Sequence, residues 1–152
     1  MILIKNTQRK IFLDIPKIHH EVENILQILG YAGFDLGIWF TSDATIRTYN
    51  RQYRHQDKPT DVLSFPYHSE LKAGEQITVT HPDDKNLGDL IVSPAYVERN
   101  AQELGVTFEH RLRVILIHGI CHLLGYDHIK DEDYMVMHAK EQDILKKLST
   151  LQ

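Results

Sequence analysis

The sequence predicts a single domain in which a small β-sheet is covered by helices. Segments with the two-residue alternation of strands are interspersed with segments that show the helical spacing of apolar residues. The chain has 152 residues, of which 42% are hydrophobic and 25% charged, as in one ordinary globular domain. It contains no internal repeat and no linker long enough to divide it. We therefore interpret residues 1–152 as one domain, large enough to bury a core without disulfides.

The N-terminal part is expected to form strands around one helix. Residues 2–4 and 11–15 are short apolar runs of the kind found in strands. Pro16 suits the first turn of a helix, and Gly30 fits its end. Apolar residues then alternate with other residues over 34–41, which predicts a half-buried strand.

The rest of the chain is expected to alternate between helices and strands and to end in helices. The expected elements are a helix over 43–54, a strand over 62–65, a polar loop over 67–86, a strand over 87–93 and helices over 94–104, over 108–124 and from 131 onward. The last helix has acidic residues in its first turn and lysines in its last, which matches the helix dipole.

Composition restricts the compartment and the partners. The single cysteine excludes an intrachain disulfide. The first apolar run is too short for a signal peptide, and no apolar run is long enough to span a membrane. We therefore expect a cytoplasmic protein without membrane contact. Because the net charge is −4, any contact with nucleic acid must come from a local basic patch.

Residues 118–128, HGICHLLGYDH, carry the pattern that predicts chemistry. His118 and His122 are four residues apart, so on a helix both imidazoles leave the same face. Gly125 can end that helix in a left-handed conformation, and the reversed chain can return His128 to the same place. Three histidines leave a coordination position open, as in catalytic zinc sites. The alternative is a set of packed or surface histidines.

Cys121 lies between two of these histidines but is expected to belong to the core. It falls on an apolar stripe at helical spacing, formed by Val114, Ile117, Cys121 and Leu124. The other seven histidines lack a comparable spacing and are expected to be surface or structural residues: His19, His20, His55, His68, His81, His110 and His138.

The histidine spacing is that of the metzincin proteases, with one departure. Those enzymes have a glutamate directly after the first histidine, where it acts as general base, but here the position is Gly119. Peptide hydrolysis by that mechanism is therefore disfavoured. A bound metal can still generate hydroxide and polarise a phosphoryl oxygen.

A basic helix face suggests phosphate. Arg47, Arg51 and Arg54 lie on one predicted helix face, with Lys58 just beyond it. The planar arginine fork suits bidentate phosphate binding. The same pattern is also typical of a solvated basic face, and the sequence does not separate the two readings.

Three blocks of the chain resemble the YbeY endoribonucleases, a family of ribosomal RNA maturation factors. Residues 118–128 are similar to the family's HGxLHLxGYDH, with Cys121 in place of a leucine. Residues 53–66, YRHQDKPTDVLSFP, resemble its YR-x-x-D-x-PTDVLSFP segment, and residues 87–93, LGDLIVS, resemble its LGDIxIS strand. The order and spacing of the blocks suit the family over nearly the whole chain, with the greatest variation expected in 67–86.

The resemblance implies an α+β fold with a mixed sheet of about four or five strands and a metzincin-like metal-site helix. It implies one metal ion, Zn²⁺, held by His118, His122 and His128, which Ni²⁺ or Co²⁺ could replace. It also implies single-strand-specific RNA cleavage in maturation of the 3′ end of small-subunit (16S) ribosomal RNA and in ribosome quality control. The partners would be single-stranded RNA and the small ribosomal subunit, with no DNA. The family's functionally important arginine corresponds to Arg54.

Our mechanistic hypothesis assigns catalytic roles to Arg54 and His118. Arg54 would neutralise charge developing on the phosphate. Asp127 would either orient a ligand imidazole or cap the following turn. Asp89 and Ser64 lie in the resembling blocks but can be purely structural. Two alternatives remain at this level, a metalloprotease-like hydrolase and a non-catalytic ribosome-assembly factor with a structural metal.

Overall fold

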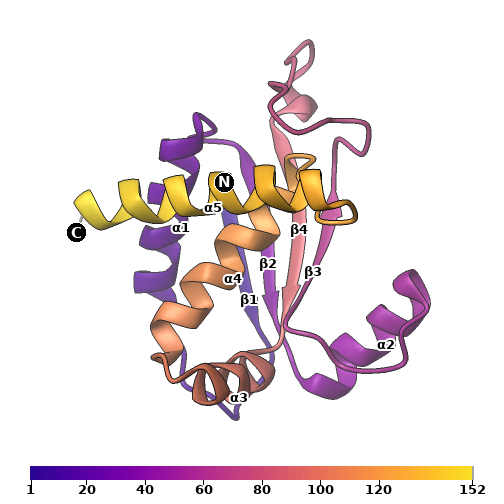
Figure 1. Ribbon diagram of the computed structural model, residues 1–152, viewed down its shortest axis with the longest axis vertical. Coiled ribbons are helices and arrows are strands. Elements are labelled where there is room, and N and C mark those ends of the chain that lie inside the picture. The colour runs from indigo at the N-terminus through magenta and orange to yellow at the C-terminus, as the bar shows by residue number, and fades with distance from the viewer. Residues whose placement is uncertain (152) are drawn as a thin grey trace.

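The computed structural model describes residues 1–151 and has an α+β architecture (Figure 1). The sheet has four strands, in the spatial order β1 (Ile2–Asn6), β2 (Asp35–Phe40), β4 (Asn86–Val92) and β3 (Val62–Pro66). β1 and β4 pair with β2 in parallel, whereas β3 pairs with β4 in antiparallel fashion and forms one edge. The mixed four-stranded sheet confirms the predicted fold class.

Five helices and one short turn complete the fold. They are α1 (Ile15–Leu29), α2 (Asp43–Arg54), the 3-10 turn η1 (Pro82–Asp84), α3 (Pro94–Leu104), α4 (Phe108–Leu123) and α5 (Asp131–Thr150). Figure 1 shows α1, α3, α4 and α5 gathered on one side of the sheet, while α2 stands apart from them near the β3 edge. Within residues 1–151, no helix combines the length and hydropathy needed to cross a bilayer.

Local capping explains why the helices begin where they do. The side chains of four residues directly before helices accept a hydrogen bond from a backbone N–H of the first turn: Asp14, Ser42, Ser93 and Thr107. Such caps satisfy backbone donors that have no partner inside a helix. The helices expected over 43–54 and 94–104 are confirmed at both ends.

The strand expected over residues 11–15 is wrong. The side chain of Gln8 accepts a hydrogen bond from the Ile11 N–H at 3.0 Å and donates one to the Ile11 carbonyl at 2.8 Å. Asp14 then caps α1, which starts at Ile15. Gln8 binds the backbone of Ile11, and Asp14 caps α1. Residues 11–15 therefore do not pair with the sheet, although their apolar side chains are typical of strands.

The two faces of the sheet have different surroundings. Ile38, Phe40 and Leu90 point to the four-helix side and are almost fully buried there. Residues at the alternate positions point to the other face, which α2 covers at one end, where Ile46 packs against Leu63 and Ile91. This division leaves β3 as an edge strand with a helix-covered side and a partly open side.

Candidate metal centre

The turn after α4 places the third histidine beside the first two. Gly125 follows the end of α4 with φ +92°, a left-handed conformation that side chains disfavour. A Cβ at Gly125 would also collide with the backbone carbonyl of Leu71. Only glycine therefore fits this position, and the chain reverses there so that His128 returns to His118 and His122. The expected reversal at Gly125 is what the structure shows.

The structure brings the three histidines of the motif together. One ring nitrogen of each lies within 4.8 Å of the others. The Nε2 atoms of His118 and His122 are 3.1 Å apart, and the His128 ring lies 5.6 Å and 5.1 Å from those two rings, centroid to centroid. Among residues 1–151, no fourth Cys, His, Asp or Glu joins this group.

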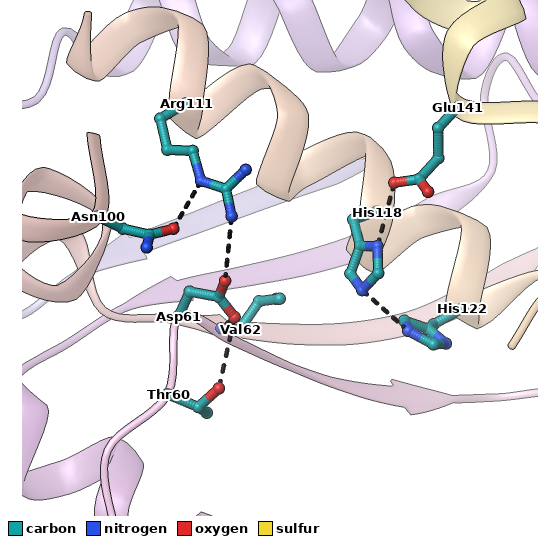
Figure 2. Close-up of polar contacts among 8 residues, drawn as sticks. All are labelled: Thr60, Asp61, Val62, Asn100, Arg111, His118, His122 and Glu141. Carbon is teal, nitrogen blue, oxygen red and sulfur yellow. Dashed lines mark hydrogen bonds and ion pairs between the residues drawn. The ribbon is translucent and has the colours of Figure 1, made fainter. Parts of the chain in front are cut away.

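The outer nitrogens of two of these rings are already engaged. His118 Nδ1 lies 3.0 Å from Oε2 of Glu141, which reaches down from α5 (Figure 2). His122 Nδ1 lies 2.9 Å from the carbonyl oxygen of Tyr126. A carbonyl or carboxylate oxygen can only accept, so each Nδ1 carries the proton. The neutral form of each ring then has a bare Nε2.

These residues fit a divalent cation. Two bare Nε2 lone pairs facing each other at 3.1 Å repel unless a positive charge lies between them. Ligands about 2.0–2.1 Å from a tetrahedral ion would stand roughly 3.4 Å apart, close to that separation. Burial, followed by the neighbouring His118 and His128, lowers the pKa of His122 to about 4, so its ring is neutral at pH 7. A neutral imidazole is the form that binds metal.

A cleft of about 650 Å³ opens in front of the histidines. Its walls come from the end of α2, from the segment through β3, from the start of the β3–β4 loop and from the turn after α4. Arg54, the last residue of α2, is the arginine of the basic face that lines it. All three histidines also line it, so the open side of the group faces the cleft.

The basic helix face is divided in two. Asp57 accepts hydrogen bonds from Arg47 Nε at 2.9 Å and from its NH2 at 3.3 Å, and lies 3.9 Å from Arg51. Arg47 and Arg51 therefore share Asp57 as an ion-pair partner. Arg54 has no ion-pair partner among the residues that the structure describes. Of the three predicted arginines, it is the one free to meet an anion in the cleft.

The β3 wall of the cleft is fastened to α4. Ser64 Oγ donates a hydrogen bond to the Gly119 carbonyl at 3.1 Å. A Cβ on Gly119 would come within 3.0–3.2 Å of Leu90 and Val62 methyl groups. Position 119, where the metzincin proteases have their base, therefore faces the sheet, at a point where α4 and the sheet approach closely. Ser64 accordingly has a structural role here.

A second tether holds the chain that enters β3. Arg111 Nε donates to Asn100 Oδ1 at 2.8 Å, and its guanidinium lies 3.9 Å from the Asp61 carboxylate (Figure 2). Asp61 in turn accepts a hydrogen bond from the Val62 N–H at 2.7 Å. This network fixes one rim of the cleft to α3 and α4.

The structure also locates Asp127, Asp89 and Cys121, for which the sequence predicts structural or site roles. Asp127 Oδ1 accepts a hydrogen bond from the Ile129 N–H at 3.3 Å, so the turn-capping alternative is the one observed. Asp89 lies on the sheet face away from the cleft. Cys121 is fully buried in the core, and burial raises the pKa of its thiol to about 12, as expected for a packing residue.

Sequence reasoning missed two residues of the site. Glu141 follows the histidine turn by a whole helix segment, and no motif spacing connects it to His118. His68, expected from the sequence to be a surface or structural histidine, has a structural hydrogen bond from its Nε2 to the Asp84 carbonyl at 2.8 Å and also lines the cleft. Its place in the loop before η1 gave no local signal.

Comparison with known proteins agrees with this geometry. Residues 3–149 match the family model described as Endoribonuclease YbeY. The human Endoribonuclease YbeY is 39% identical over 97% of this chain and 87% of its own length. The Aquifex aeolicus relative of the same description is 40% identical, over 97% and 91%. A solution structure of a Thermotoga maritima protein matches with a TM-score of 0.63 and 30% identity, covering 97% of this chain and 89% of that one.

Proposed function

The chain belongs to the endoribonuclease YbeY family, and we propose that it cleaves single-stranded RNA with a metal ion held by His118, His122 and His128. The observation that carries this proposal is the pair of bare Nε2 atoms, 3.1 Å apart, with His128 beside them. The proposed ion is Zn²⁺, one per chain, which Ni²⁺ or Co²⁺ could replace. When bound, such an ion supplies a Lewis acid and an activated water near neutral pH.

Other residues of the chain would orient the metal ligands and neutralise charge on the substrate. Glu141 and the Tyr126 carbonyl hold the protons on the Nδ1 atoms, so the Nε2 lone pairs stay directed at one point. The unpaired guanidinium of Arg54 meets a phosphate in the cleft and neutralises the charge that develops there. The proposed substrate is ribosomal RNA, in maturation of the 3′ end of the small-subunit RNA in the cytoplasm. The small ribosomal subunit is the proposed partner.

The first experiment tests the ion and the reaction together. Protein purified without an affinity tag should contain about one zinc per chain by elemental analysis, as a site of this donor set implies. It should cut single-stranded RNA, and a chelator should abolish the cleavage. His128→Ala should lose the ion but stay folded, because that side chain is exposed. A folded, metal-free wild-type enzyme with full activity would refute the proposal.

Arg54→Ala tests the phosphate role. The variant should keep its metal but lose activity by at least tenfold, because a positioned charge in such a site is worth about 2–4 kcal/mol. Arg47→Ala is the matched control, since that arginine is paired with Asp57 and does not line the cleft. Loss of the ion in Arg54→Ala, or equal losses in both variants, would contradict the role.

The identity of the nucleophile follows from the products. A 2′,3′-cyclic phosphate end would show that the RNA's own 2′-hydroxyl attacks, whereas a direct 3′-hydroxyl would show attack by water. Casein incubated with the same metal-loaded protein should remain intact, because Gly119 supplies no base and faces the sheet. Neither the protease nor the non-catalytic alternative is favoured, since the relatives carry the name of an RNA-cleaving enzyme.

A further inference from the structure

The sheet face opposite the four helices carries a hollow of about 440 Å³. Its floor is formed by side chains that alternate with the core residues, among them Lys5 of β1, Asp89 of β4 and Phe65 of β3. α2 closes only one end of this face, through Ile46. The hollow therefore lies on the opposite side of β3 from the metal-site cleft.

Four aromatic side chains form a continuous row along the hollow, here called the aromatic row: Trp39, Tyr49, Tyr53 and Phe65. Successive rings lie 5.7, 6.2 and 5.2 Å apart, centroid to centroid. Trp39 is fixed by a 2.9 Å hydrogen bond from its Nε1 to Thr7, and Tyr53 is 56% exposed. Fixed and accessible aromatic rings on a four-stranded sheet are a surface on which unpaired bases stack.

The aromatic row is continuous with the cleft. Tyr53 directly precedes Arg54, which lines the cleft at the end of α2. Phe65 lies between Ser64 and Pro66, whose side chains line the cleft on the other face of the same strand. β3 is an edge strand, so a flexible polymer can pass around it from one face to the other. An RNA strand that leaves the cleft past Arg54 meets Tyr53 and Phe65 next.

The hollow also contains two charged side chains, Asp89 and Lys5. The carboxylate of the exposed residue Asp89 lies over Gly37, where a Cβ would collide with its Oδ1. A carboxylate accepts two hydrogen bonds from the adjacent N–H groups of guanine, whereas it repels the carbonyl oxygens that flank the single N–H of uracil. Lys5 Nζ lies 5.1 Å from the Trp39 ring centroid and can meet a phosphate or a base oxygen.

We propose that this hollow binds an unpaired base of the RNA strand whose backbone occupies the cleft, and that it prefers guanine. The proposal rests on the RNA-cleaving function proposed above. It makes the aromatic row a second contact that the substrate reaches after turning around β3.

Trp39 is the only tryptophan of the chain, so its fluorescence reports on the hollow directly. The zinc-loaded protein is mixed with adenosine-rich RNA oligonucleotides that carry one central guanosine or one central uridine, and the first binding phase is recorded before cleavage. Both oligonucleotides should quench Trp39, and the guanosine one should bind roughly tenfold more tightly, as one bidentate contact implies. Unchanged emission in a protein that does bind the RNA would overturn the proposal.

Matched variants assign the contact to named residues. Tyr53→Leu should weaken RNA binding by roughly fivefold or more, the effect of losing one stacked base. Tyr134→Leu should not, although that tyrosine of α5 is equally exposed, at 55%. Asp89→Asn should abolish the preference for guanosine but keep the quenching. Equal effects of the two tyrosine variants, or an unchanged base preference in Asp89→Asn, would contradict the proposal.

The outcomes separate this inference from the proposed function. If the wild-type protein neither binds nor cuts RNA, the proposed function fails and the inference falls with it. If RNA is cut and Arg54→Ala impairs cleavage while Trp39 does not respond, only the inference fails. Trp39 emission that changes with protein concentration but not with RNA would assign the hollow to a second copy of the chain instead.

Discussion

Gly119→Ala should destabilise the protein, which is the opposite of what helix propensity alone predicts. In the interior of a helix, alanine is favoured over glycine by about 1 kcal/mol. At this position, however, the new Cβ would lie 3.0 and 3.2 Å from the two δ-carbons of Leu90 and 3.2 Å from a Val62 methyl group. Leu90 is 1% exposed and Val62 6%, so both contacts lie in the interior, where moving either side chain disturbs its packed neighbours.

The packing cost should exceed the propensity gain. Inserting a methyl group into a filled core costs about 1–3 kcal/mol. The net loss is therefore about 1 kcal/mol, or roughly 3 °C in melting temperature for a chain of this size. Separation of α4 from β3 would also lengthen the hydrogen bond from Ser64 to the Gly119 carbonyl. Zinc affinity should fall together with stability, since His118 precedes this contact.

Urea unfolding of wild type and Gly119→Ala, in chelator and in zinc, measures the effect. Leu90→Ala provides the control background, because it removes both δ-carbons that the new methyl group would meet. In that background Gly119→Ala should become stabilising, with a coupling energy of at least about 1 kcal/mol. A Gly119→Ala protein that is about 1 kcal/mol more stable than wild type would refute the close approach of α4 and the sheet.

Three further outcomes follow from individual residues. His55→Gly should stabilise the protein by about 1 kcal/mol in urea unfolding, because His55 ends α2 with φ +57°, a conformation that costs little only for glycine; an unchanged stability would contradict that geometry. Cys121 should resist iodoacetamide in the folded protein and react fully in urea, because its thiol is buried and the pKa of that thiol is raised to about 12. Labelling of Cys121 in the native protein would contradict its place in the core. Metal-free protein should lose stability as the pH falls from 6.5 to 4. The unfolded chain protonates His122 below pH 6.5, whereas burial and the neighbouring histidines lower the pKa of His122 in the fold to about 4. The His122 contribution is at most about 3 kcal/mol, and the loss measured by urea unfolding over this pH range should be smaller in His122→Gln; an equal loss in both proteins would contradict this assignment.

The elements that were predicted correctly have short-range causes. The alternation over β2 and the caps and stops of α2 and α3 lie within a few residues of the positions they determine. The error over 11–15 has a different origin. Gln8 engages the Ile11 backbone, and this competition does not appear in any apolar pattern. Local sequence therefore predicts an element well only where its backbone partners are also local.

The candidate site shows the same limit. The proximity of His118 and His122 follows from the pitch of one helix, and Gly125 provides the turn to His128. Asp57 pairs with Arg47, whereas Arg54 has no ion-pair partner among residues 1–151, and this difference depends on how the chain folds back after α2. Glu141 reaches His118 only because α5 packs across the end of α4 (Figure 1). Such tertiary contacts decide which of several chemically similar residues belong to the site.

Position 119 shows how chemistry and packing can depend on one residue. In the sequence, Gly119 occupies the position where the metzincin proteases have their catalytic glutamate. In the structure, it is the point at which α4 lies against Leu90 and Val62. A glutamate there would bring its Cβ to 3.0–3.2 Å from two buried apolar side chains and would carry a charge into this packed region, at a cost of several kcal/mol. Restoring the protease residue by substitution should therefore destabilise the contact between α4 and the sheet. The close packing of α4 on the sheet, which holds His118 at the cleft, thus excludes the chemistry that the histidine spacing alone would allow.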